Sequence, residues 1–156
     1  MKTILILVGK TQSKIFKLGI DDYVSRIEHY MPFSITTIPE LKNTKSLSED
    51  QQKQKEGELI LKEIHPGDTV VLLDEHGMEL RSVEYAKWLK QKQNIARRLV
   101  FIIGGPYGFS PNIYARSNEK ISLSRMTFSH QMVRLIFTEQ LYRACTIIKG
   151  EPYHHE

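Results

Sequence analysis

Short apolar runs recur along the chain between segments with a helical period, and this alternation constrains the fold more than any other feature. The run Leu99–Ile103 reads LVFII, with no polar residue among its apolar ones. Such runs are typical of strands that are covered on both faces, as in parallel sheets. Similar runs predict strands at residues 3–8, 34–38, 69–73 and 120–123.

The segments between these runs predict helices, because residues suited to a helix start precede apolar residues at three- and four-residue spacing. The predicted helices run from Ser13 to Tyr30, from Ser48 to Ile64, from Ser82 onward, from Ser110-Pro111 onward and from His130 to Ile148, and residues 74–79 are predicted to form a turn. Strands that alternate with helices predict the α/β class, with a parallel sheet flanked by helices. Since no repeat or linker interrupts the pattern, we expect residues 1–156 to form a single domain.

The chain has 156 residues and a net charge of +4, which is unevenly placed. Residues 1–96 hold equal numbers of basic and acidic side chains, so the excess of Lys and Arg lies in residues 97–156. A basic segment favours an anionic partner such as nucleic acid. The apolar run near the start is too short for a signal peptide or a membrane span, and a lone cysteine, Cys145, suits a reducing compartment. We therefore expect a cytoplasmic protein without a membrane partner.

A glycine-rich stretch, FIIGGPYGFS, covers residues 101–110 at the end of a predicted strand. Glycine there lets a ligand approach the main chain closely, although a tight turn without a ligand has the same composition. The glycine fingerprint of dinucleotide-binding proteins and the phosphate-binding loop of NTPases are both missing. We expect the site where Asp74, Gly104–Gly108 and Leu123–Phe128 meet, with apolar walls and backbone groups suited to an adenine-like group.

The last predicted helix is apolar round most of its circumference, so we expect it to be buried on more than one side. Its second buried side would be a subunit interface or would lie wholly within the fold. A polar line at four-residue spacing faces one way and consists of His130, Arg134, Thr138 and Tyr142. His130 and Arg134 would start this helix beside the glycine loop, and they are therefore candidates for substrate contacts.

The chain ends in PYHHE. Tyr153 offers a surface on which a base can stack, and His154 and His155 can donate to phosphates or titrate near neutral pH. Adjacent histidines do not easily point at one ion, and no matching ligands are obvious elsewhere, so we expect no metal site.

The segments FIIGGPYGFSP, LSRMTFSHQMVRLIFTEQLYRA and PYHHE, together with ILILVGK and YMPFSITTIPE, resemble one family over essentially the whole chain. The family is that of the small bacterial ribosomal RNA methyltransferases of the SPOUT class, which methylate N3 of a pseudouridine in the large subunit. The resemblance implies a trefoil knot at the carboxyl-terminal end of the α/β fold, a homodimer, S-adenosylmethionine as methyl donor, and large-subunit rRNA in the ribosome as substrate.

Carried over by position, the resemblance places cofactor contacts on Leu73, Gly104, Leu123, Ser124, Arg125, Met126, Thr127 and Phe128. The candidates for assisting proton loss are His130, His154 and His155, while Arg134 and Arg143 would hold phosphate or an anionic base and Tyr153 would stack. A uracil-like imide proton can also leave to water once positive groups stabilise the anion, and then no general base is needed.

Two other functions use the same class of fold. One is a catalytically silent RNA-binding or ribosome-assembly module, and the other is an oxidoreductase with an atypical dinucleotide loop. The glycine loop together with the segment LSRMTF argues against the silent module, and the missing early glycine fingerprint argues against the oxidoreductase.

Overall fold

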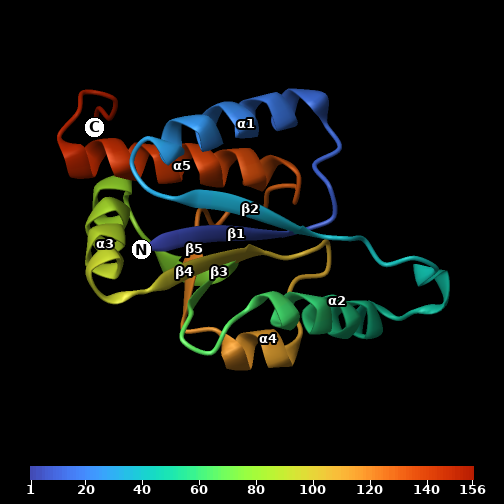
Figure 1. The fold of residues 1–156 in the computed structure, drawn as a ribbon. Coiled ribbons are helices and arrows are strands. Elements are labelled where there is room, and N and C mark those ends of the chain that lie inside the picture. The colour runs from blue at the N-terminus through green and yellow to red at the C-terminus, as the bar shows by residue number, and fades with distance from the viewer.

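The computed structural model describes residues 1–156 and contains a five-stranded sheet in the order β2-β1-β4-β3-β5 (Figure 1). Every neighbouring pair of strands is parallel. The strands are β1 (Lys2–Val8), β2 (Phe33–Ile38), β3 (Thr69–Glu79), β4 (Arg98–Ile103) and β5 (Glu119–Ser122). The helices are α1 (Lys14–Glu28), η1 (Thr44–Ser46), α2 (Glu49–Glu63), α3 (Ser82–Ile95), α4 (Pro111–Arg116) and α5 (Met132–Lys149). The predicted α/β class is confirmed.

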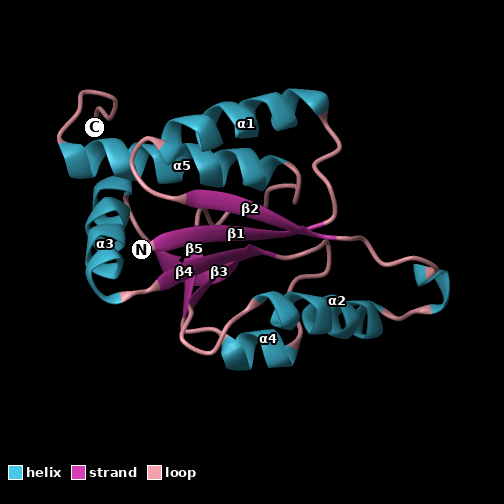
Figure 2. Ribbon diagram, viewed as in Figure 1, coloured by secondary structure: helices cyan, strands magenta, loops and turns pink.

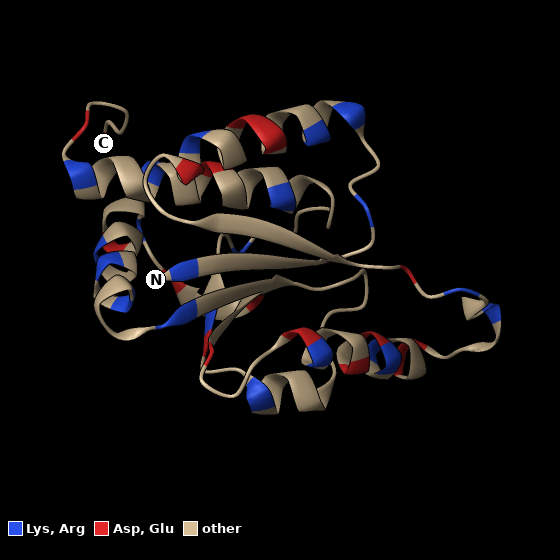
Figure 3. Cartoon of the chain, in the orientation of Figure 1, with Lys and Arg blue, Asp and Glu red and all other residues tan.

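Helices cover both faces of the sheet (Figure 2), so successive residues of a strand enter different cores. Leu5 and Leu7 of β1 belong to a cluster with side chains of α1, α3 and α5. Ile4 and Ile6 belong to a second cluster, with side chains of α2 and α4. This burial on both faces explains why β1 and β4 show continuous apolar runs instead of alternation, and Figure 3 shows a basic residue at the start of each of these two strands.

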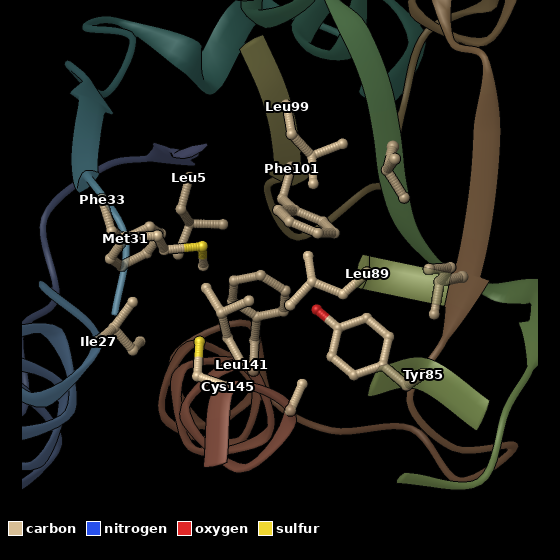
Figure 4. Close-up of a cluster of buried hydrophobic side chains, with 14 of the residues drawn as sticks. Leu5, Ile27, Met31, Phe33, Tyr85, Leu89, Leu99, Phe101, Leu141 and Cys145 are labelled. Carbon is tan, nitrogen blue, oxygen red and sulfur yellow. The ribbon is translucent and has the colours of Figure 1, made fainter. Parts of the chain in front are cut away.

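The larger cluster lies under α5 (Figure 4), where Leu5, Phe101, Tyr85 and Leu141 converge with Cys145. Cys145 is 3% exposed, and burial raises the pKa of its thiol to about 12, so it serves as a packed small residue of the core. The helix packs against α1 and α3 as well as the sheet. Most of its apolar circumference is therefore buried within the chain.

Three local predictions need correction. Residues 74–79 do not form a turn but continue β3, which resumes its pairing with β5 at Met78 after a register shift. Ser82 is not the cap of α3; that helix is capped at Arg81, whose backbone N–H donates to Glu84 Oε2 at 2.7 Å. The last helix begins at Met132 instead of His130, and its first N–H donates to Ser129 Oγ at 3.0 Å.

The chain changes sides of the sheet after β5. Ile113 of α4 packs in the smaller cluster, whereas Phe137 of α5 packs in the larger one. The connecting segment therefore passes the carboxyl ends of the strands, where the Gln131 side chain accepts from the Gln12 N–H at 2.8 Å. This crossing brings residues 123–131 to the edge of the sheet at which a ligand site was predicted.

Candidate active site

A cavity of about 590 Å³ lies at the carboxyl ends of β3 and β4. Its walls come from the three stretches predicted to meet, and from helix α2. The lining residues are Glu49, Lys53, Leu73, Asp74, Glu75, His76, Ile103, Gly104, Gly105, Pro106, Tyr107, Gly108, Phe109, Tyr114, Leu123, Ser124, Met126, Thr127, Phe128 and Val133. The position agrees with the rule that ligands of α/β sheets bind at the carboxyl ends of the strands.

The glycine loop, residues 104–109, forms a tight hairpin in which the Gly108 N–H donates to the Gly105 carbonyl at 3.2 Å. A Cβ atom on Gly104 would lie 3.1 Å from the Phe109 ring and 3.3 Å from the Gly108 carbonyl oxygen. Gly108 has a φ of +83°, which side chains rarely adopt. Glycine is thus required for the shape of the loop itself, and the compact turn keeps its backbone at the cavity wall.

The segment Leu123–Phe128 forms the opposite wall of the cavity. The Met126 N–H donates to Ser124 Oγ at 2.9 Å, and Thr127 Oγ1 donates to Glu75 Oε2 at 3.2 Å. All of the predicted cofactor contacts line the cavity except Arg125. Its side chain is 84% exposed and lies 3.7 Å from Glu79, so it does not face the cavity.

A carboxylate at the cavity rim is held in its ionised form. Tyr114 Oη donates to Asp74 Oδ2 at 2.5 Å, and the His76 N–H donates to Oδ1 at 2.9 Å. Desolvation opposes ionisation of Asp74, but these hydrogen bonds outweigh it and lower the pKa of the carboxyl group. Burial and the same contact raise the pKa of Tyr114 to about 12, so its hydroxyl stays a donor at neutral pH.

Several residues that line the cavity are not among those predicted from the sequence. Glu75 and His76 follow the predicted strand end directly, and their position next to Asp74 is a signal that could have found them. Glu49 and Lys53 come from the first turns of α2, and nothing in their local sequence marks them as cavity residues. Tyr107 lies inside the glycine loop, where it is 43% exposed.

Arg134 lies at the start of α5 but is fully buried. Its guanidinium donates to the carbonyls of Val8 at 2.8 Å and Gly9 at 2.9 Å, and to Thr11 Oγ1 at 3.0 Å. It also reaches back to the His130 carbonyl at 3.1 Å. The side chain therefore fixes α5 to the end of β1 and is not open to a substrate in this conformation, whereas His130 is half-buried.

The remaining candidate residues gather at the other end of α5. Arg143 contacts Glu139 Oε1 with two nitrogens, at 2.5 and 3.0 Å, and lies 4.8 Å from the centre of the Tyr153 ring. Tyr153 Oη donates to the same carboxylate at 3.1 Å. Unlike these residues, His155 is exposed.

His154 has a defined tautomer in this network. Arg143 Nη1 lies 3.1 Å from His154 Nδ1, and an arginine can only donate, so Nδ1 accepts. The proton of the neutral ring is then on Nε2, which is buried and has no hydrogen-bond partner. Nε2 lies 3.8 Å from Glu156 Oε1, which is too far for a hydrogen bond.

These two groups of candidates are far apart within one chain. Val133, at the beginning of α5, lines the cavity, whereas the terminal residues pack beyond Lys149 against Tyr23 and Tyr30 of α1 and its following turn. A helix of 18 residues is about 27 Å long. Figure 1 shows the C-terminus at the end of α5, on the same side of the molecule as the start of β1, and Glu156 lies 2.7 Å from Arg81, just after the end of β3.

The chain contains no cluster of three or more His, Cys, Asp or Glu residues suited to hold a metal ion. None of its helices combines the length and the apolar character needed to cross a membrane.

Comparisons with known proteins identify the family of this chain. A family model described as "Predicted SPOUT methyltransferase" matches residues 1–154. Among curated proteins, one from Phocaeicola vulgatus is 63% identical and one from Bacteroides fragilis is 62% identical, each over 157 aligned residues that cover 100% of both chains. A protein from Porphyromonas gingivalis is 52% identical, again over the full length of both chains. All three are named ribosomal RNA large subunit methyltransferase H. The chain is thus a methyltransferase of the SPOUT family, whose fold implies a trefoil knot.

Proposed function

We propose that this protein uses S-adenosylmethionine to methylate N3 of a pseudouridine in large-subunit ribosomal RNA, and that it acts as a homodimer. The observation that carries the proposal is the cavity in which the glycine loop and residues 123–128 form opposite walls. Its full-length relatives are named as methyltransferases of large-subunit ribosomal RNA, which supports the same class of substrate.

The cavity fits the proposed cofactor in size and chemistry. Its volume of about 590 Å³ falls in the range of sites that hold drug-sized ligands. Ile103, Leu73 and Phe128 provide apolar surface for an adenine. Among the backbone hydrogen bonds of turns and loops, the glycine loop contributes one N–H donor, that of Gly108. Lys53 and Asp74 provide charges of both signs for a zwitterionic amino-acid group.

The bound cofactor would supply an electrophilic methyl group, so the chain's own residues have to place the base and accommodate its N3 proton. Arg143 and Tyr153 offer a cation and an aromatic face in contact with each other. His154 adds one unsatisfied Nε2–H that can donate to a base carbonyl or phosphate. These groups orient the base and stabilise its anion, and this role does not require a general base.

A second copy of the chain is part of this proposal, because the terminal residues pack at the end of α5 that is remote from the cavity. Half-buried Ile136 lines a small pocket with Leu80 and Tyr85, and the buried Tyr85 hydroxyl has no partner within the chain. A partner packed on this face would bring its own terminal residues toward the first cavity, which shares Leu123 with the small pocket.

Transfer of labelled methyl groups to ribosomes from a strain that lacks this protein tests the proposal. Free rRNA, isolated large subunits and whole ribosomes are compared as substrates, and the labelled nucleotide is mapped. Label at N3 of one pseudouridine is the expected result. Cofactor binding without transfer to any of the three substrates would instead favour a silent RNA-binding or assembly module, and binding of NADH in place of S-adenosylmethionine would favour an oxidoreductase.

A further inference from the structure

Helix α2 packs tightly against both ends of the glycine loop. A Cβ atom on Gly105 would lie 2.8 Å from Glu56 Oε1 and 3.2 Å from Oε2. A Cβ atom on Gly57, the next residue of the helix, would lie 2.3 Å from Ser110 Oγ just after the loop. The pair Glu56-Gly57 therefore supports the loop from outside the cavity, because neither residue lines it.

Glu56 is an unusual residue for this position. It is 5% exposed, and no basic side chain is paired with it. Its Oε2 accepts from Gln52 Nε2 at 3.2 Å, but Oε1 has no hydrogen-bond partner. An ionised carboxylate with an unpaired buried oxygen is unfavourable, and a neutral acid at the same place is much less so.

The surroundings of Glu56 also favour the neutral acid. Desolvation is the main cause that raises the pKa of its carboxyl group, and the charge of Glu40 adds to it, while the hydrogen bond from Gln52 opposes it. On its own helix Lys53, three residues earlier, lies 3.3 Å from Asp50. The neighbouring part of the glycine loop, Gly104–Pro106, has no titratable side chain, and Ser110 and Asn112 at the α4 side are neutral.

We propose that Glu56 is a positioning residue for cofactor binding, whose neutral carboxyl group fixes Gly105 from behind and so holds the loop backbone in the shape that the cofactor needs. This inference rests on the proposed function, since the loop is its cofactor wall. The protonation of Glu56 makes cofactor affinity depend on pH. Cofactor affinity is full while Glu56 is protonated and falls as the pH rises through the pKa of this buried acid.

The test compares the full-length protein with Glu56→Gln, Glu56→Ala and, as an exposed control on the same helix, Glu58→Ala. Binding of S-adenosylhomocysteine is measured by calorimetry between about pH 5 and pH 9, a range that covers raised carboxyl pKa values. We expect the wild-type affinity to fall with pH and the affinity of Glu56→Gln to stay constant, because the amide cannot ionise. Glu56→Ala should bind about tenfold more weakly at low pH. Glu58→Ala should behave like the wild type.

A second pair of variants tests contact between Glu56 and the loop. Gly105 does not have a positive φ, so Gly105→Ala is strained only by its contact with the Glu56 carboxyl group. We expect Gly105→Ala to weaken binding by about tenfold, and Glu56→Ala/Gly105→Ala to bind no more weakly than Glu56→Ala alone. Losses that simply add in the double variant would overturn the inference, as would identical pH profiles for the wild type and Glu56→Gln.

Hydrogen exchange of the loop amides in the ligand-free protein separates this inference from the proposed function. Glu56→Ala should speed exchange at residues 104–108, whereas Glu56→Gln and Glu58→Ala should not. Unchanged exchange in Glu56→Ala would overturn the positioning role even if the protein binds the cofactor. Faster exchange in a protein that binds no S-adenosylhomocysteine at any pH would refute the proposed cofactor and leave the positioning role supported. If Glu56→Ala does not fold, Glu56→Gln and Gly105→Ala still decide the question.

Discussion

At the scale of single residues, Gly104 has too little space around it for a side chain. The Phe109 ring and the Gly108 carbonyl already approach the position of a Cβ atom to 3.1 and 3.3 Å. A side chain at Gly104 can therefore be accommodated only if the Phe109 ring or the loop backbone shifts. Because the loop is one wall of the cavity, its movement would alter the proposed cofactor site.

We predict that Gly104→Val weakens binding of S-adenosylhomocysteine by at least about tenfold. The branched side chain would push Phe109 and the Gly108 carbonyl away and deform the cavity wall. Calorimetric titration measures the loss, with circular dichroism to show that the variant is folded. Gly67→Ala is the matched control, because nothing lies within 4 Å of its Cβ position. Equal affinities of Gly104→Val and the wild type would place the cofactor elsewhere.

Arg134 illustrates a limit of prediction at the residue scale. Its spacing from His130 places both on one helix face, which is correct, but spacing does not reveal what that face meets. The structure directs the guanidinium to carbonyls at the end of β1, more than a hundred residues earlier in the chain. Such a long-range partner leaves no trace in the local sequence.

At the scale of elements, Arg134 is a buried polar link between α5 and the end of β1. We predict that Arg134→Ala lowers the free energy of unfolding by about 3 kcal/mol, because it leaves several buried carbonyls without donors. Urea unfolding measures the change, and Arg125→Ala, with an exposed side chain, should leave stability nearly unchanged. If Arg134→Ala keeps full stability and loses only methyl transfer, Arg134 serves the substrate instead.

The outer face of α5 offers a second test at this scale. Ile136 is half-buried at the small pocket beside α3, whereas Leu141 is fully buried in the core. We predict that Ile136→Glu yields a folded monomer, because the charge would have to be buried in the proposed interface. Leu141→Glu should fail to fold, because the same charge would lie inside the chain. Light scattering on purified Ile136→Glu checks the first outcome, and a stable dimer would show that this face is not the interface.

Strands and helices could be predicted from the sequence where the residues that start, end or fill an element lie within that element. Ser13 and Ser48 do cap the first two helices, and Ser48 exchanges hydrogen bonds with Gln51. The extension of β3 could not be predicted, because Met78 joins the sheet only by pairing with Ile121. Gly77 makes that approach possible, since a Cβ atom there would lie 2.6 Å from the Ile121 nitrogen. The local sequence around Gly77 favours a turn, because it does not reveal this long-range contact with Ile121.

The candidate site could be predicted in part for the same reason. Leu73, Gly104 and Leu123–Phe128 end or follow strands, and the carboxyl ends of parallel strands meet at one edge of the sheet. Lys53 and Glu56 reach the cavity and its glycine loop from a helix whose placement depends on the packing of Ile60 in the smaller core. The knot implied by the family concerns the path of the whole chain, and no periodicity encodes such a path.

At the scale of the whole molecule, the terminal residues are more firmly attached than their length suggests. A tail of this length alone would add little to stability, but Tyr153 packs on Tyr142 with ring centres 4.7 Å apart. Tyr30 also donates to Glu151 at 2.5 Å, and Arg81 is 2.7 Å from Glu156. Deletion of residues 152–156 would therefore disturb packing, and a point variant is the cleaner test of function.

We predict that His154→Ala keeps its affinity for S-adenosylhomocysteine and loses most methyl transfer to ribosomes, because it removes the unused Nε2–H donor without touching the cavity. Mixing His154→Ala with Gly104→Val subunits should restore part of the activity, since a mixed dimer holds one intact cavity and one intact tail on different chains. Methyl transfer before and after subunit exchange measures this recovery. Lack of recovery in verified mixed dimers would indicate a site made within one chain.

The position of α5 also governs when the chain can fold. Phe137, Leu141, Ala144 and Cys145 complete the larger core, so residues 1–131 leave part of one face of the sheet uncovered. A chain made from its amino terminus must keep that apolar face in water until its last residues have been synthesised. Its contacts between α1 and α5 join opposite ends of the sequence, and such distant pairings form slowly. Because α5 is synthesised late, the fold is completed late. Until α5 has packed on the sheet, the uncovered apolar surface can aggregate.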